Sequence, residues 1–299
     1  MNGMKRMLVK ALLLSVFAPP AAWAQEGKGD VVYVPTPQIV VDEMLNMAKV
    51  GPKDFLIDLG SGDGRIVITA AKKFGTRGFG VDLDPVLVKE ARDNAKREGV
   101  ADRVEFREEN LFTTDLSPAT VITSYLLPEM NVKLRPVLMS LKPGTRVVTH
   151  DYDVDGWYPD DEKTISVPEK NVGDPGKSYI FFYIVPARIA GQWESLVQTG
   201  GRAIIYEFEF DQSFQRVSGD MRVDNQPVRL PVFQVQGERL TFDVDAPQGK
   251  LRFQGTVQGD VIQGTVTVGG GKPLPWTAKL KRRGEMRVSA LDAGEGRIR

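Results

Sequence analysis

The sequence predicts two domains of different class: a doubly wound, mostly parallel seven-stranded α/β sheet, followed by a smaller antiparallel β-barrel or sandwich. Between residues 33 and 186, strand-like apolar runs alternate with helical stretches, which is typical of a parallel sheet covered on both faces. Between 189 and 285, short segments of period two are separated by glycines, and no convincing helical pattern occurs. The length of 299 residues also favours two domains.

The first domain follows a regular order of strands and helices. The apolar run at 55–59 is typical of a buried parallel strand, and Gly75 ends the helix that follows it. Pro85 favours the first position of a later helix, and the last two strands are expected to pair antiparallel. In chain order, we expect helix 38–47, strand 55–59, helix 64–74, strand 78–81, helix 85–98, strands 104–106 and 119–125, helix 129–141 and strands 145–150, 165–167 and 179–185.

The second domain shows the alternation of half-buried strands. Residues 203–208, 239–244 and 250–253 each alternate apolar and polar side chains, and glycines separate these segments. Near its start, Gly191-Gln192-Trp193 resembles the G-x-W motif of lipocalin-like barrels. A lipocalin-like domain is therefore expected at 189–285.

The two ends of the chain are expected to lie outside the fold. A basic stretch, the short apolar run 11–18 and Ala22-Trp23-Ala24 predict a secretory signal peptide at 1–24, cleaved after Ala24. The apolar run is too short for a permanent membrane span, and a frayed amphipathic leader is the alternative. We therefore expect an exported, periplasmic protein without a stable span, and a disordered tail at 286–299.

Composition excludes several kinds of chemistry. The chain has no cysteine, which rules out disulfides, thiolate metal sites and cysteine nucleophiles. Its single histidine, His150, makes a histidine-based metal site improbable, and we expect no metal. The net charge is zero at pH 7, which argues against a nucleic-acid partner.

A glycine-rich turn follows the first predicted strand and is the main functional signal. It reads Asp58-Leu59-Gly60-Ser61-Gly62-Asp63-Gly64, with the third glycine one residue earlier than in the dinucleotide fingerprint G-x-G-x-x-G. This form resembles motif I of class I S-adenosylmethionine (SAM)-dependent methyltransferases, which implies SAM as cofactor. By that resemblance Asp58 acts on the amino-acid part of SAM, while Gly60, Ser61 and Gly62 let the backbone approach it. Capping of the next helix is the alternative role for Asp58.

A second acid follows the next predicted strand. Asp82 lies 82 − 58 = 24 positions after Asp58, close to the spacing of about 20 for a ribose-binding acid. One carboxylate offers two acceptor oxygens to two vicinal hydroxyls. Gly80-Val81-Asp82 also resembles the end of the second strand in class I methyltransferases, which implies that Asp82 binds the ribose. Asp84 competes for this role, but before Pro85 it more naturally caps a helix.

Residues after the third predicted strand are expected to contact adenine. The resemblance implies an acidic residue that accepts from the adenine amine, followed by an apolar residue against the ring. Asn110 occupies the matching position, and its amide oxygen can also accept a hydrogen bond. Leu111 follows it, with Glu109 and Phe112 as the alternatives and an ordinary core role open for both apolar residues.

Three residues near the ends of the fourth and fifth predicted strands are the candidates for catalysis. Tyr125 is expected to position the substrate, with Ser124 beside it, and His150 is a candidate proton acceptor near the mouth of the site. Tyr-Leu-x-Pro from residue 125, Gly-Trp-x-Pro at 156–159 and Tyr33-Val34-Pro35-Thr36-Pro37 resemble a group of seven-strand protein-lysine methyltransferases. The resemblance covers about 33–186.

These observations predict an exported SAM-dependent methyltransferase acting on a nitrogen, with a protein lysine as the expected acceptor. One alternative is a small-molecule or lipid methyltransferase in which the β domain gathers an apolar acceptor. The other is a non-catalytic binding protein that retains the methyltransferase fold, since SAM is made in the cytoplasm. Fold alone does not decide among them.

Overall fold

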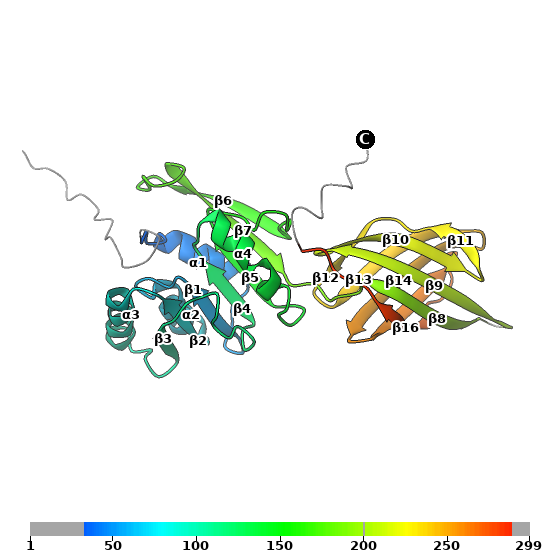
Figure 1. Ribbon diagram of the computed structural model, residues 1–299, viewed down its shortest axis with the longest axis horizontal. Helices are drawn as coiled ribbons and strands as arrows, with labels where there is room; N and C mark the ends of the chain where they lie inside the picture. The colour runs from blue at the N-terminus through cyan, green and yellow to red at the C-terminus, as the bar shows by residue number, and fades with distance from the viewer. Residues whose placement is uncertain (1–32, 200, 289–299) are drawn as a thin grey trace, which may run out of the picture.

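The computed structural model describes residues 33–199 and 201–288 and contains two bodies of β-structure (Figure 1). The predicted signal peptide, 1–24, and most of the predicted tail, 289–299, lie outside the described residues. Within the described part, no helix combines the length and apolar character that crossing a membrane requires.

The first body is a seven-stranded mixed sheet with the order β3-β2-β1-β4-β5-β7-β6. The first five strands pair in parallel, β7 runs antiparallel to β5, and β6 runs antiparallel to β7. The predicted doubly wound, mostly parallel sheet is confirmed. The strands are β1 (Phe55–Leu59), β2 (Arg77–Asp82), β3 (Val104–Glu108), β4 (Val121–Ser124), β5 (Arg146–His150), β6 (Asp161–Val167) and β7 (Gly176–Ile184).

Strand β6 is longer than predicted from the sequence, where only 165–167 showed a strand pattern. Most of its side chains are exposed, because it is an edge strand that pairs with β7 alone. Residues that face solvent on both sides carry no apolar alternation, so the sequence pattern misses the first half of such a strand.

Helices cover both faces of this sheet. They are α1 (Gln38–Met47), α2 (Arg65–Phe74), α3 (Pro85–Arg97) and α4 (Pro128–Leu138). Leu56 packs in one core with residues of α1, α2 and α3, whereas Ile57 packs in another core with residues of α4. Successive side chains of a strand point to opposite faces, so the continuous apolar run of β1 serves both cores.

The strand order places a crevice at one edge of the sheet. From β1 the chain passes to β2 and β3 on one side, then crosses to β4 and β5 on the other. Leu59, the last residue of β1, lies in register with Val81 and Ser124. Ligands of open α/β sheets bind at such a switch point, outside the carboxyl ends of the strands. Gly60, Asp82 and Tyr125, the residues that follow these three positions, therefore come together.

The second body is an antiparallel β-barrel. Eight of its nine strands form a closed circuit through the pairing of β9 with β10, and β11 extends β10 outside that circuit. Its interior is filled mainly by aromatic and branched side chains, among them Tyr206, Phe253 and Trp276. The predicted antiparallel domain is confirmed as a barrel, and its likeness to lipocalins stays a prediction. The strands are β8 (Gly191–Thr199), β9 (Arg202–Ser213), β10 (Arg216–Val223), β11 (Gln226–Arg229), β12 (Phe233–Gln236), β13 (Arg239–Ala246), β14 (Gly249–Gln258), β15 (Val261–Val268) and β16 (Leu274–Arg283).

Specific contacts join the barrel to the sheet. The rings of Trp157 and Phe214 stack with their centroids 6.0 Å apart, and the Gln215 Nε2 donates to the Tyr158 carbonyl at 2.6 Å. The Ala187 N–H donates to the Gly237 carbonyl at 2.7 Å. These contacts fix the barrel against the α/β domain through residues that do not line the cavity described below.

Candidate active site

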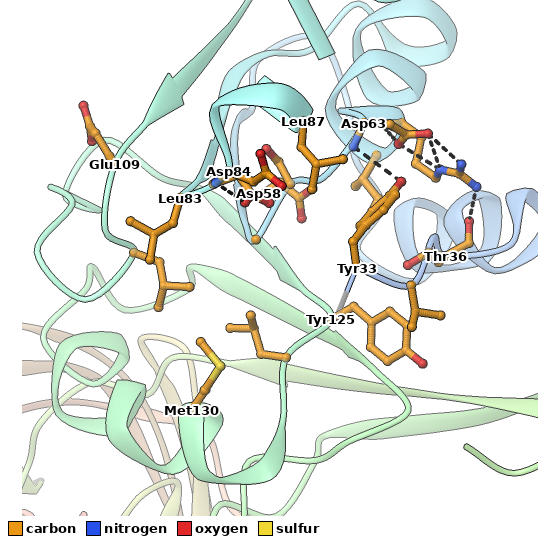
Figure 2. A pocket seen from close by; sticks show the side chains of 18 of the residues that line it. Tyr33, Thr36, Asp58, Asp63, Leu83, Asp84, Leu87, Glu109, Tyr125 and Met130 are labelled. Atoms are coloured by element: carbon orange, nitrogen blue, oxygen red, sulfur yellow. Dashed lines mark hydrogen bonds and ion pairs between the residues drawn. The ribbon is translucent and has the colours of Figure 1, made fainter. Parts of the chain in front are cut away.

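A cavity of about 330 Å³ lies at the carboxyl edge of the sheet (Figure 2). Its lining comes from segments 33–36, 58–66, 82–87, 109–112 and 125–130, all within the α/β domain. Of the predicted site residues, it brings together Asp58, Gly60, Ser61, Asp82, Asn110, Leu111 and Tyr125. Gly62, Ser124 and His150 are outside the lining.

The glycine turn has a backbone that side chains would not tolerate. Gly62 and Gly64 have φ of 51° and 81°, in the left-handed region. A Cβ on Gly62 would lie 2.1 Å from the Tyr33 ring, and one on Gly64 would lie 2.5 Å from Phe106. Glycine at these two positions is therefore required by conformation and by space, and the turn holds its backbone against the cavity.

Asp82 fixes this turn and still has acceptor capacity. Its Oδ2 accepts from the Gly62 N–H at 2.9 Å and its Oδ1 from the Asp84 N–H at 3.0 Å. Each carboxylate oxygen has a second lone pair, so two acceptor sites remain for a ligand. Asp84 is more buried and its side chain accepts from the Val86 N–H at 2.8 Å, which confirms it as the cap of α3. The geometry thus favours Asp82 over Asp84 for the ribose.

Asp58 is a buried carboxyl at the base of the cavity. It is 2% exposed, and Thr123 donates to its Oδ1 at 2.7 Å. Burial raises the pKa of Asp58 to about 7, and the negative charges of Asp82 and Asp63 add to this effect. The alternative helix-cap role does not apply, because α2 begins after Gly64. A buried acid with a raised pKa in a cavity is typical of a ligand-binding position.

The polar groups of the cavity fit SAM. Ser61 Oγ is buried in the lining and has no hydrogen-bond partner among the described residues. An orphaned buried hydroxyl of this kind favours a polar ligand beside it. Carboxylates at 58 and 82 suit an ammonium and two ribose hydroxyls, and Leu87 and Leu111 supply apolar surface for a base.

The predicted adenine contacts lie on one wall. The Asn110 side-chain oxygen accepts from the Phe112 N–H at 2.9 Å and retains one lone pair. Leu111 is 9% exposed, whereas Phe112 is 37% exposed and available to a ligand. Figure 2 shows the Glu109 carboxylate turned away from Asp58 and Asp84. The structure thus leaves Asn110 and Leu111 in position, and their contact with adenine stays a prediction.

The three predicted catalytic residues occupy different layers. Tyr125 lines the cavity, and its hydroxyl donates to the Asp151 Oδ2 at 2.9 Å. Ser124 is buried at the end of β4, outside the lining. His150 is fully buried behind Tyr125, with ring centroids 4.0 Å apart, so it is not at the mouth of the site as expected. The roles of all three stay predictions.

His150 is held as a neutral ring. Its Nδ1 lies 3.2 Å from the Thr36 Oγ1 and its Nε2 lies 3.0 Å from the Ser178 Oγ. Burial lowers the pKa of His150 to about 4, against the opposing charge of Asp151. Its contacts connect the N-terminal segment, β5 and β7 behind the cavity.

The segment 33–36 is part of the site, although only its resemblance to other methyltransferases marked it in the sequence. The Tyr33 ring covers Gly62, and its hydroxyl accepts from the Asp63 N–H at 3.4 Å. Arg65 pairs with Asp63 at 2.6 Å and donates to the Thr36 carbonyl at 2.8 Å. These bonds fasten the segment across the glycine turn. Figure 2 shows Tyr33 beside Tyr125 at the cavity.

Comparisons with known proteins agree with this site. The model of the ANTKMT methyltransferase domain matches residues 58–161. A protein-lysine N-methyltransferase of Saccharolobus islandicus is 42% identical over 157 residues, covering 52% of this chain and 94% of the relative. A lysine N-methyltransferase of Homo sapiens, named for a component of the ATP synthase, is 31% identical over 156 residues, covering 51% of this chain and 66% of that protein.

A solved structure is also similar. The crystal structure of an RNA methyltransferase from Salinibacter ruber with S-adenosyl-L-homocysteine (SAH) is 52% identical, with a TM-score of 0.47, and covers 52% of this chain and 96% of that chain.

The fold and the cavity define a class I SAM-dependent methyltransferase. Within that class, the chain belongs to the family of the Saccharolobus islandicus enzyme.

Proposed function

We propose that this protein transfers a methyl group from SAM to the side-chain amine of a lysine in another protein. The observation that carries the proposal is the 42% identity to a protein-lysine N-methyltransferase across nearly its whole length. The cavity supports it, because the residues that match the SAM motifs lie together at the carboxyl edge of the sheet.

Bound SAM supplies a methyl group activated on a sulfonium. Asp58 and Asp82 bind its polar parts, and the Tyr33 ring covers the glycine turn and limits the access of water. The reaction needs little acid–base chemistry beyond a neutral amine, so orientation within the cavity is the main contribution of the protein.

A lysine amine must lose its proton before it can attack. An ammonium has no lone pair, and its ordinary pKa is about 10.4. Val34, Leu126 and Met130 form an apolar part of the cavity lining. Apolar surroundings disfavour the charged form and lower the pKa of an amine that enters them. We therefore assign to these three residues the desolvation of the acceptor.

The test is incubation of the protein with tritium-labelled SAM and a cell-envelope extract, followed by acid hydrolysis and separation of amino acids. We expect label in methylated lysine, and almost none with the Asp82→Ala variant. Label confined to lipid would replace this proposal with the lipid methyltransferase. Absence of label together with intact SAM binding would favour the non-catalytic binding protein.

We further propose that the chain is exported and cleaved after Ala24. The support is the basic, apolar and Ala-x-Ala sequence pattern of residues 1–24. N-terminal sequencing of the protein purified from its native cells is expected to begin at Gln25. A sequence beginning at Met1 or Asn2 would contradict cleavage.

A further inference from the structure

Asp151 has three features that ordinary surface acids lack. It follows β5 directly, it is a non-glycine residue with a φ of 60°, and its side chain is only 6% exposed. Aspartate tolerates the left-handed region better than most residues, but such a conformation persists only where its surroundings enforce it. Strained residues of this kind cluster at functional sites.

The carboxylate of Asp151 collects hydrogen bonds from three parts of the fold. Its Oδ2 accepts from the Tyr125 hydroxyl at 2.9 Å and lies 2.6 Å from the Lys170 Nζ. Its Oδ1 accepts from the Tyr179 N–H at 3.1 Å. Tyr125 and Lys170 thus meet at the same oxygen, and Tyr125 alone among these partners lines the cavity.

Lys170 comes from the loop between β6 and β7 and is buried in this pair. Its side chain is 6% exposed, and its Nζ also donates to the Lys177 carbonyl at 2.5 Å. The other titratable neighbour, His150, lies 3.4 Å from the Asp151 Oδ1 and is neutral at physiological pH. Lys170 is therefore the cation that balances the carboxylate charge.

A purely stabilising role explains this arrangement poorly. Burying two charges costs desolvation energy, and well-packed apolar residues often stabilise a fold as much as a buried ion pair or more. An apolar pair would not hold the Tyr125 hydroxyl, however. Because that hydroxyl donates to Asp151, the phenol ring is fixed at the cavity and its oxygen keeps its lone pairs as acceptors.

We propose that Asp151 and Lys170 are positioning residues that act through Tyr125 to hold the acceptor side of the cavity in its reactive arrangement. Lys170 keeps Asp151 ionised and in place, and Asp151 fixes the phenol of Tyr125. The loop between β6 and β7, outside the cavity lining, thereby contributes to the reaction. This inference rests on the proposed function for its kinetic test.

The kinetic test is a double-mutant cycle in the labelled-SAM assay described above. Lys170→Met and Tyr125→Phe are each expected to lower the initial rate at saturating SAM about tenfold, with the KM for SAM changed less than twofold. The double variant is expected to equal Tyr125→Phe alone, since Lys170 acts through that ring. Multiplied losses in the double variant, or a normal rate in Lys170→Met, would overturn the proposal.

A matched control lies on the same hairpin. Lys163 pairs with Glu43 at 2.7 Å on the surface, and Lys163→Met removes a comparable ion pair without touching Asp151. It is expected to retain the wild-type rate. A loss equal to that of Lys170→Met would show that any weakening of the hairpin lowers activity, and would overturn the positioning role.

A spectroscopic test is independent of activity and uses the full chain labelled with ¹³Cζ-tyrosine. Tyr125→Phe assigns the Tyr125 resonance by its disappearance. Asp151→Asn, which keeps the size of the side chain and tolerates the positive φ, and Lys170→Met are both expected to shift that resonance. An unmoved resonance in both variants overturns the inference even in an active enzyme. A shifted resonance in a protein that transfers no label refutes the proposed function and leaves the network intact.

Discussion

The two domains contain similar amounts of β-structure but use their side chains differently. In the parallel sheet, the strands end at one edge and bring Asp58, Asp82 and Tyr125 to one cavity. In the barrel, alternation along each strand turns the large side chains inward, where Phe253 contacts four other aromatic rings. A sheet therefore gathers reactive groups where parallel strands end, whereas closure of an antiparallel sheet fills its interior with apolar side chains.

The largest expected effect separates stability from binding. Phe253→Ala deletes a fully buried ring from the barrel and should lower the free energy of unfolding of that domain by about 3–5 kcal/mol. Urea denaturation measures this change. Calorimetric titration with SAH at a temperature where both domains are folded should give the wild-type affinity. A parallel loss of SAH affinity would contradict the division of labour between the domains.

Removal of the ribose acid tests the other side of the comparison. Asp82→Ala should weaken SAH binding by about 1.5–3 kcal/mol, since it removes hydrogen bonds from a charged acceptor. It also frees the Gly62 N–H that the carboxylate holds. Calorimetric titration measures the affinity, and an unchanged dissociation constant would refute the ribose assignment.

Asp58 should make binding depend on pH. Because its pKa is raised from 3.8 to about 7, the folded protein holds a proton at this site between these values that the unfolded chain releases. Its contribution to the free energy of unfolding is therefore present below pH 4 and is lost as the pH rises through 7.

The ligand amine has the opposite preference, because an ammonium binds the carboxylate rather than the neutral acid. SAH affinity should rise by up to about tenfold per pH unit as the pH approaches 7, and level off above it. Titrations from pH 5.5 to 8.5 measure this curve. Asp58→Asn should give a weaker and flat profile over the same range. A wild-type profile without slope would remove Asp58 from the ligand site.

The smallest expected effect is at Asp84, two residues from Asp82. Asp84→Ala removes the cap of α3 and should lower the free energy of unfolding by about 1 kcal/mol. SAH affinity should change less than twofold, which makes this variant the matched control for Asp82→Ala. Equal losses of affinity in the two variants would mean that the turn, rather than the Asp82 carboxylate, determines binding.

Local patterns predicted the class of both domains and most of the cavity. The glycine turn and Asp82 are readable because short-range geometry dictates them: the turn needs positive φ, and the acid follows a strand next to it. The pairing of Tyr125 with Asp151 and Lys170 was not predictable, because it joins residues 26 or more positions apart across β5 and β7. His150 was placed wrongly near the mouth, because burial by Thr36 and Ser178 arises only on folding.

Hydrogen exchange of the full chain with and without SAH tests the central claim most directly, because it reports both domains in one experiment. We predict that SAH slows exchange in segments 33–36, 58–66, 82–87 and 109–112 and leaves the barrel strands from 191 to 283 unchanged. Protection within the barrel, or none in the glycine turn, would contradict the assignment of SAM binding to the carboxyl edge of the parallel sheet.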